Sequence, residues 1–347
     1  MLMILRLDKD ALERFVFPAG IVAVALLIRS VYLYQIFGTP LDNAAYTGES
    51  PMHLDAMQSI LDGNFSEIAA SPLHVIYEFF AAALFGAFKI GVFSVRVAQI
   101  LLDCLTAALI LRLSRQLGLN RDAGLLAATV YAFYGIAVFY SPLILDAAFT
   151  TFLCAALMSA ALSAPPRLKN PALLIFGALA VLAPAAIGRH EGGSVMNAVL
   201  FWNGAEPPDG ISYEISKKLA PLFLWPFFSF ALLAPFGLAG LVLGIVKKRT
   251  QLYPAVIFTF FYWAAAAAGA AMTDRFRLPC IPVISILGAY AVSELLSALK
   301  PLSVKRAAAI LLLLGAAALF TRIDLTAAAD EKLPPSVLTR PVSETTL

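Results

Sequence analysis

The sequence predicts an all-α integral membrane protein, a polytopic bundle of about nine transmembrane helices with two juxtamembrane helices in its first outer loop. Hydrophobic residues make up 61% of the 347 positions and the mean hydropathy is +0.84, more apolar surface than a soluble core of this length can bury. Apolar runs of membrane-crossing length recur between short polar loops. Basic residues gather in alternate loops, which is typical of loops that stay in the cytoplasm.

Each predicted span is an apolar run near the ~20 residues that a helix needs to cross the hydrocarbon core. The nine runs are 15–37, 93–115, 121–140, 143–163, 171–188, 220–246, 252–271, 279–297 and 306–321. The first is longer than the core of a secretory signal and lacks a small-residue cleavage site, so we expect it to remain as a span. Three cysteines lie in apolar runs without metal-ligand spacing, which predicts buried helix residues.

One further apolar run, 72–90, decides the direction of all the others. If it lies along the outer face, the basic clusters Arg112–Arg121, Lys247–Arg249 and Lys300–Arg306 fall on the side of the N-terminus. If it crosses, the first two clusters move to the other side and the charge bias is lost. The positive-inside rule therefore predicts a cytoplasmic N-terminus and an external C-terminus in the cytoplasmic (inner) membrane.

We expect a single transmembrane domain over residues 1–321, followed by an external polar tail over residues 322–347. Its first outer loop, 38–92, carries two helices, because Ser50-Pro51 and Ser71-Pro72 each place a capping hydroxyl before a proline at the first helical position. Apolar side chains recur at helical spacing along the first of these, which predicts a helix lying in the interface plane. That stripe consists of Met52, Leu54, Met57, Ile60 and Leu61.

Two charged residues, Arg29 and Asp103, fall inside predicted spans. Each costs about 2.5–3.5 kcal/mol at the bilayer centre on insertion scales, so each needs a partner. Counted from the outer ends of their helices at ~1.5 Å per residue, their depths differ by about 3 Å. We predict that they pair, as a structural ion pair between the first two spans or, less simply, as part of a proton relay.

Three groups of polar residues on the outer side could carry chemistry. The first is Glu49, just before a helix N-terminus that stabilises negative charge, with His53 in that helix. The second is Asp146, at the outer mouth of a span. The third is the turn 273–279, where Arg275 and Arg277 form a cationic site at headgroup level that suits a phosphate.

Carboxylates beside an arginine-rich lip indicate group transfer from a phosphate-linked, membrane-resident donor. Plainer interpretations stay open. Topology alone favours an acidic outer loop, Asp146 suits a helix cap, and the two arginines suit anchoring of helix ends to headgroups. The histidines at 53, 74 and 190 match no zinc spacing and are more often plain polar contacts, so no metal site is predicted.

The chain resembles the bacterial branch of the GT-C glycosyltransferases, the group of protein mannosyltransferases and the lipid A aminoarabinose transferase. No single motif carries the resemblance, which depends on the order of several stretches between about residues 15 and 295. These are Glu49–Gly63, Ser71–Tyr77, Ala82–Gly86, Arg96–Gln99, Arg112–Gly118, Tyr131–Gly135, Leu145–Asp146, Leu200–Glu206 and Arg275–Pro279. The region between Pro171 and Arg189 is shorter than in the family, so the chain resembles an internally shortened member.

The resemblance implies a polyprenyl-phosphate sugar donor and sugar transfer on the outer face of the cytoplasmic membrane. It implies that Glu49 is the first-loop acid and base, with Asp55 as the alternative because the family more often has Asp there. It also implies that Asp146 is the second-loop acid and that Arg277, with Arg275 beside it, contacts the donor phosphate. The remaining cavity residues that it implies are His53, His74, Trp202 and Asn203.

The leading hypothesis is therefore a membrane glycosyltransferase that moves a sugar from a polyprenyl-phosphate donor to an acceptor. The alternative is a non-catalytic protein of the same fold that binds a lipid-phosphate or a partner subunit. A transporter fits less well, because the sequence shows no inverted repeat. The expected partners are the lipid-linked sugar and membrane lipid, with no nucleic acid. No cofactor is implied, and the sequence leaves open whether a divalent metal ion is needed.

Overall fold

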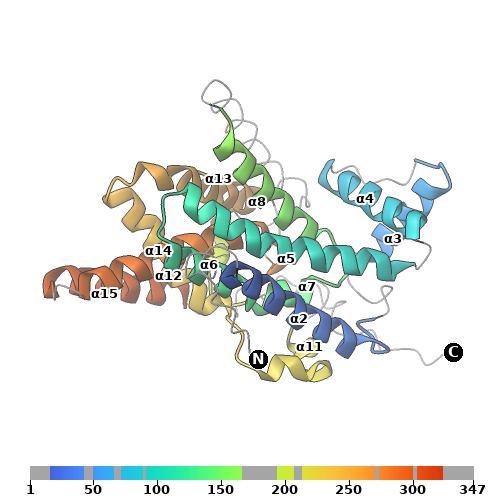
Figure 1. Cartoon of the computed structure of the whole chain (residues 1–347), viewed down its shortest axis with the longest axis horizontal. Coiled ribbons are helices and arrows are strands. Elements are labelled where there is room, and N and C mark those ends of the chain that lie inside the picture. The colour runs from blue at the N-terminus through green and yellow to red at the C-terminus, as the bar shows by residue number, and fades with distance from the viewer. Residues whose placement is uncertain are drawn as a thin grey trace, which may run out of the picture.

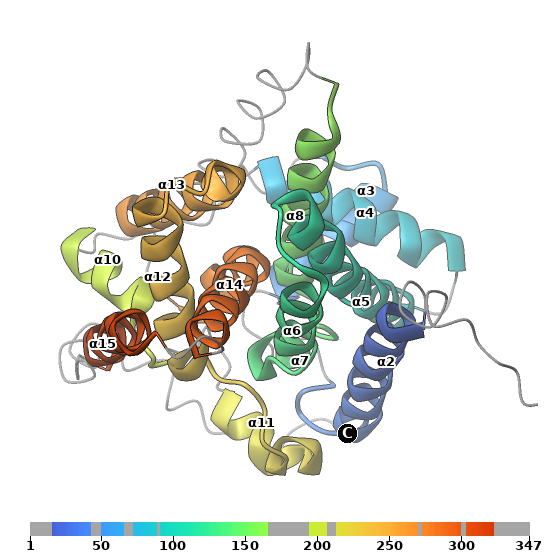
Figure 2. The ribbon, with the colours of Figure 1, turned by 60° about the vertical axis from the view of Figure 1, so that its left-hand side comes forward.

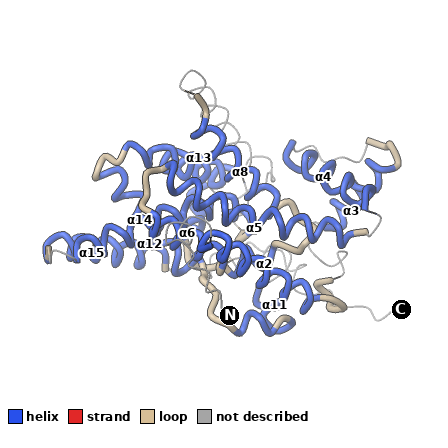
Figure 3. The backbone as a smooth tube through the Cα atoms, in the orientation of Figure 1, coloured by secondary structure: helices blue, strands red, loops and turns tan. Residues whose placement is uncertain are grey.

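A computed structural model of the chain describes residues 16–42, 50–65, 72–88, 91–165, 194–206, 213–269, 273–299 and 303–322. Figure 3 shows that the described residues form helices joined by loops, without a strand. The predicted all-α fold is confirmed for this part of the chain. The three cysteines are buried and free, as predicted.

The described part of the chain contains α-helices and short 3₁₀ helices. They are α2 (Phe17–Ile36), α3 (Ser50–Leu61), α4 (Pro72–Phe88), α5 (Val92–Gln116), α6 (Arg121–Ala132), α7 (Gly135–Tyr140), α8 (Ala147–Ser163), α10 (Ser194–Trp202), α11 (Tyr213–Leu219), η3 (Pro221–Leu224), α12 (Phe230–Val246), η4 (Thr250–Leu252), α13 (Tyr253–Gly269), η5 (Arg275–Cys280), α14 (Ile281–Leu299) and α15 (Val304–Thr321).

Five of the described helical segments are long and apolar enough to cross a membrane, which makes the chain a membrane protein. They are Phe17–Ile36, Val92–Gln116, Thr250–Ala268, Arg275–Leu299 and Val304–Thr321. Three further apolar helical segments are shorter: His74–Phe88 of α4, and α8 and α12 at 17 residues each. The predicted span 171–188 lies outside the described residues, and the count of nine is therefore not reached within them.

The predicted span 121–140 is not one continuous helix, because the chain leaves the helix at Phe133 and Tyr134 between α6 and α7. There the backbone forms a short bridge with Phe228: the Phe228 N–H donates to the Phe133 carbonyl at 2.9 Å, and the Gly135 N–H donates to the Phe228 carbonyl at 3.1 Å. A Cβ at Gly135 would meet the Tyr213 hydroxyl at 2.1 Å. The break therefore depends on a segment almost a hundred residues away in the sequence.

Helix α14 lies at the centre of the bundle, between α12 and α6, as Figure 2 shows. On the other side of α6, helix α5 packs against α8 and α2. The close approach of α12 to α14 requires glycine, because a Cβ at Gly240 would lie 1.9 Å from the Leu287 carbonyl oxygen. Small residues let helix backbones approach in this way within a membrane, where packing rather than water exclusion holds helices together.

Replacing Gly240 with Ala is expected to destabilise the protein by about 1–3 kcal/mol, since backbone atoms must move apart to admit the methyl group. Gly315→Ala in α15 is the matched control, because nothing lies within 4 Å of its Cβ position. Thermal unfolding of the purified protein in detergent measures both. Equal unfolding temperatures for the two variants would contradict the packing argument.

Helices occur at both predicted juxtamembrane positions. Figure 1 shows α3 and α4 together beside the start of α5, at the right of the molecule. The face of α3 that packs inward carries His53, Ala56 and Met57, whereas Met52 and Leu61 of the predicted apolar stripe are exposed. We call this the α3–α4 end of the bundle.

The opposite end of the bundle lies where α5 finishes. The 25 residues of α5 correspond to about 37 Å at ~1.5 Å per residue, so its two ends are far apart. The turn after α5 meets α14 there, where the Asn120 amide lies 3.5 Å from the Ser293 hydroxyl. We call this the Glu294 end, after the buried carboxylate that several basic side chains surround.

Candidate functional site

A buried polar cluster lies beneath the two juxtamembrane helices at the α3–α4 end. We call it the α4 cluster; its members are His53, His74, Tyr77, Glu78 and Asp146, all buried. His53 Nδ1 lies 3.4 Å from Glu78 Oε1, and His74 Nε2 lies 3.5 Å from Asp146 Oδ2. The His53 ring meets the rings of His74 and Tyr77 edge to face, with centroids 5.4 and 5.0 Å away. Two histidines and two carboxylates are thus packed together out of water.

Asp146 occupies the N-cap position of α8, and its carboxylate makes no capping bond to the helix backbone. The Thr150 hydroxyl lies 3.5 Å from Asp146 Oδ2. The side chain is only 3% exposed, so the carboxylate faces the cluster at the positive end of a helix dipole. Asp146 thus has the position of a helix cap, as the plainer interpretation expects, but not its hydrogen bond.

Arg275 of η5 is buried, and η5 packs against α8, the helix that Asp146 precedes. Burial raises the pKa of the Tyr77 hydroxyl well above its ordinary value, and the Asp146 and Glu78 carboxylates raise it further, whereas the Arg275 guanidinium acts in the opposite direction. A buried cation and a potential base therefore lie within electrostatic range of the same phenol.

The two arginines of the predicted cationic turn point to different places. The turn is a 3₁₀ helix, in which side chains two residues apart are separated by about 120° around the axis. Arg277 donates to the carbonyls of Leu200, Asn203 and Ala205 at 2.8, 3.0 and 2.8 Å and stacks over the Phe230 ring. Its terminal nitrogens thus close the C-terminal end of α10, and the two guanidinium groups do not form one patch.

Trp202 and Asn203, predicted as cavity residues, are both buried at the end of α10. The Asn203 side-chain oxygen accepts from the Ala205 N–H at 2.9 Å, and Trp202 stacks edge to face on Phe201. These contacts fold the chain around Arg277. They lie on the α10 side of η5, and the structure does not bring them to the α4 cluster.

The structure describes only one of the two candidates for the first-loop base, Asp55. Glu49 lies outside the described residues. Asp55 lies on the exposed face of α3, whereas His53 and Ala56 face inward. Of the predicted outer-side residues, the structure therefore brings together His53, His74, Asp146 and Arg275, and leaves Asp55 in solvent.

The sequence did not lead us to predict Tyr77 and Glu78 as site residues. The structure shows that both are fully buried. A signal was present, because Glu78 is an acid within the otherwise apolar run 72–90 and stands four residues after His74. That spacing places both side chains on one face of a helix. Among the described residues, no three His, Cys, Asp or Glu side chains are grouped so that they could hold a metal ion.

The predicted ion pair between Arg29 and Asp103 is confirmed. Both side chains are buried, and Arg29 also donates to the Ala132 carbonyl at 3.1 Å. The Tyr131 hydroxyl donates to the second oxygen of Asp103. The pair therefore joins α2, α5 and α6, which favours the structural interpretation of these two charges.

A second ion pair, which the sequence did not predict, holds the loop after α2 to α5. Arg96 donates to the Asp42 carboxylate and to the Asp42 carbonyl, and the Gly38 N–H donates to the carboxylate at 3.0 Å. Partial burial raises the pKa of Asp42, but the hydrogen bonds from Gly38 and Arg96 outweigh it and hold the pKa below its ordinary value. The charged carboxylate is thus the form that stabilises the fold.

The contribution of Asp42 is expected to depend on pH. A lowered pKa in the folded state stabilises the protein above the ordinary pKa of about 3.9, and this stabilisation is lost as the pH falls through the folded value. The unfolding temperature of Asp42→Asn should therefore lie below that of the parent near neutral pH, by a difference worth about 1–2 kcal/mol. The difference should disappear in acid. Asp62→Asn, at an exposed carboxylate that accepts hydrogen bonds from the Gln58 amide, is the control.

Comparison with protein-family models, with curated proteins and with solved structures finds no match to this chain.

Proposed function

We propose that this chain is a membrane glycosyltransferase that moves a sugar from a polyprenyl-phosphate donor to a hydroxyl acceptor at the outer face of the cytoplasmic membrane. The observation that carries the proposal is the burial of Asp146 and Arg275 within electrostatic range of one phenol, Tyr77, at the α3–α4 end of an apolar bundle. A base and a phosphate-binding cation are the two groups that this transfer needs.

The proposed chemistry uses groups of this chain only. A carboxylate, Asp146 or Glu49, accepts the proton of the acceptor hydroxyl. At the same time the oxygen of that hydroxyl bonds to the anomeric carbon of the sugar. The bond from that carbon to the phosphate oxygen breaks, and the lipid phosphate leaves with both electrons. Arg275 stabilises the negative charge of the departing phosphate through charge-assisted hydrogen bonds. In this proposal Arg277 holds the chain after α10 in place and does not bind the phosphate itself, because it already bonds three backbone carbonyls.

The proposal includes the predicted orientation and span number. In nine spans with a cytoplasmic N-terminus, the α3–α4 end faces outward and the Glu294 end faces the cytoplasm, where the basic loops belong. Cysteines introduced at the exposed positions 88 and 115 test this by labelling from one side of sealed vesicles, since the three native cysteines are buried. Labelling of both positions from the same side would contradict the orientation.

A second candidate is a protein of the same fold that binds a lipid-phosphate without turnover. The engagement of Arg277 with the chain itself favours it, because one of the two predicted donor-binding arginines is already used in holding α10. This candidate predicts saturable binding of polyprenyl phosphate and no release of sugar.

The experiment that separates the two candidates is incubation of the purified chain, in lipid nanodiscs, with a set of polyprenyl-phosphate sugars and hydroxyl acceptors. Glycosyl transfer predicts release of free polyprenyl phosphate that requires an acceptor. Binding of polyprenyl phosphate without release favours the second candidate. If the chain neither binds nor cleaves any of these donors, both proposals are wrong.

A further inference from the structure

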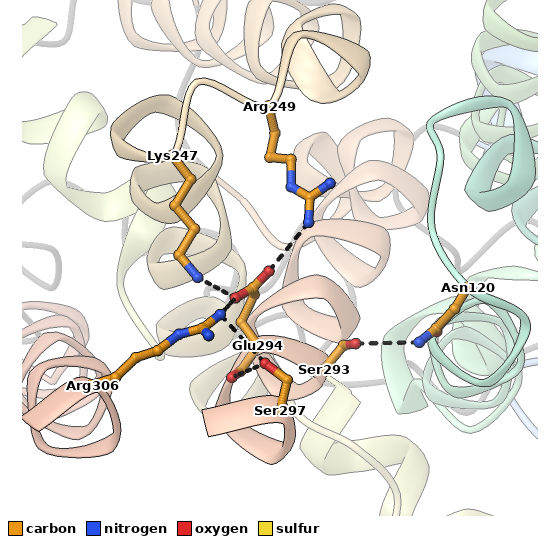
Figure 4. A network of polar contacts seen from close by, with 7 residues as sticks. All are labelled: Asn120, Lys247, Arg249, Ser293, Glu294, Ser297 and Arg306. Carbon is orange, nitrogen blue, oxygen red and sulfur yellow. Dashed lines mark hydrogen bonds and ion pairs between the residues drawn. The ribbon is translucent and has the colours of Figure 1, made fainter. Parts of the chain in front are cut away.

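The Glu294 end holds a cluster in which basic side chains outnumber the carboxylate, unlike the α4 cluster with its two carboxylates. Neither candidate function uses it. Figure 4 shows Glu294 of α14 with basic side chains from two segments, the turn 247–249 after α12 and helix α15, converging on it. Its Oε2 accepts from Lys247 and, at 2.6 Å, from Arg306 Nη2, while Arg249 Nη2 lies 3.8 Å from its Oε1. Three cations surround one carboxylate that is 8% exposed, so the cluster carries net positive charge.

A cavity of about 180 Å³ adjoins this cluster. It is lined by the turn 117–120 after α5 and by Arg249, Gln251, Tyr290, Ser293 and Glu294. At about 30 Å³ per water molecule it has the volume of roughly six waters, enough for a phosphate group. Gly118 holds the turn open: it has a positive φ of 74°, and a Cβ there would meet the Gln251 side chain at 1.8 Å.

One buried polar atom in this cavity is placed to bind a ligand. Tyr290 is 7% exposed and lines the cavity with Arg249 and Glu294 as its polar neighbours, and its hydroxyl makes no hydrogen bond of regular geometry within the described part of the chain. Leaving a buried hydroxyl without a hydrogen bond costs about 1–3 kcal/mol of stability, so such groups rarely lack a partner. A bound acceptor such as a phosphate oxygen would satisfy it.

The cavity continues into a second, more apolar cleft between α6 and α14. The two share Asn120, Ala123 and Ser293 in their walls. The second has a volume of about 220 Å³, and its wall includes Leu126, Val292 and Leu296, with Asp122 also present. A polar, cationic cavity is thus joined to a cleft along the apolar side of two helices, an arrangement that matches a phosphate group with an acyl chain attached.

We propose that the Glu294 end binds the phosphate headgroup of an anionic membrane lipid, with the phosphate beside Arg249 and the Tyr290 hydroxyl and the acyl chain in the α6–α14 cleft. Glu294 does not oppose this binding, because Lys247 and Arg306 already balance its charge. The planar guanidinium of Arg249 bonds phosphate oxygens in pairs, which a lysine would not do. The site lies about 37 Å from the α4 cluster along α5 and does not depend on the proposed function.

The test is binding of phosphatidylglycerol to the purified full chain in detergent, followed by native mass spectrometry. Arg249→Gln is expected to weaken binding about tenfold or more, the effect of losing a charge-assisted hydrogen bond. Tyr290→Phe removes only the hydroxyl and is expected to weaken binding severalfold. Arg115→Gln is the matched control, because this exposed arginine stands at the same end of α5 and does not line the cavity.

Two further probes separate the sources of phosphate. Diacylglycerol with the same chains lacks the phosphate and is expected to bind weakly, and glycerol phosphate lacks the chains and is expected to compete poorly. Diacylglycerol binding as well as phosphatidylglycerol would overturn the proposal. So would full competition by glycerol phosphate, which would mean a site for a free phosphate, or unchanged binding by folded Arg249→Gln and Tyr290→Phe variants. Circular dichroism and the unfolding temperature establish that each variant is folded.

Discussion

Asp146→Asn is expected to abolish sugar transfer while the protein still inserts and folds. The amide has the same shape as the carboxylate but cannot accept the proton of the acceptor hydroxyl. Loss of a positioned general base lowers the rate by about 10²–10⁴-fold. The measurement is release of polyprenyl phosphate by the purified variant, with the rate at saturating donor and the Michaelis constant determined separately.

The position of Asp146 in the structure makes this substitution informative. Its carboxylate makes no helix-capping bond, so its removal is expected to leave the backbone of α8 unchanged, and His74 Nε2 lies 3.5 Å from its Oδ2. Asp122→Asn, in the first turn of α6 and exposed, is the matched control and should keep full activity. A folded Asp146→Asn protein that transfers sugar at the rate of the parent would remove Asp146 from the mechanism. In that case, loss of sugar transfer in Glu49→Gln would assign the base to Glu49.

The second large effect is expected at the buried pair of Arg29 and Asp103. Asp103→Leu leaves the Arg29 guanidinium buried without its counter-ion, which destabilises a protein by about 3–5 kcal/mol. The loss should be greater than that of the charge pair alone, because the Tyr131 hydroxyl also loses its acceptor. Thermal unfolding in detergent measures the change.

The double variant Arg29→Met with Asp103→Leu should recover most of that stability, since apolar residues of similar size replace both charges. The recovery distinguishes a structural ion pair from two independent contributions. If the two single effects simply add, the pair does not act as a unit. Arg112→Met, at an exposed arginine of α5 whose side chain bonds only the Ser163 hydroxyl among the described residues, is the control and should change little.

Much of the architecture follows from the sequence because a membrane leaves few alternatives. A run of apolar residues such as 93–115 must form a helix, since every backbone polar group has to be bonded within the segment. The same constraint places the ion pair: two charges that are costly in lipid and lie at similar depth must meet, so the partner of Arg29 could be identified from spacing alone. Serine-proline pairs likewise predicted α3 and α4.

What the sequence could not determine depends on contacts between distant segments. The helix break between α6 and α7 needs the Phe228 backbone, and the separate directions of Arg275 and Arg277 follow from the 3₁₀ geometry of η5. The Glu294 end combines a carboxylate of α14 with basic side chains from the turn 247–249 and from α15, which no local pattern joins. The sequence by itself thus determined where helices form and that they lie in a membrane, because hydrophobicity and backbone bonding are local properties. Only the tertiary structure decided which polar side chains share a site, because that depends on how the helices pack.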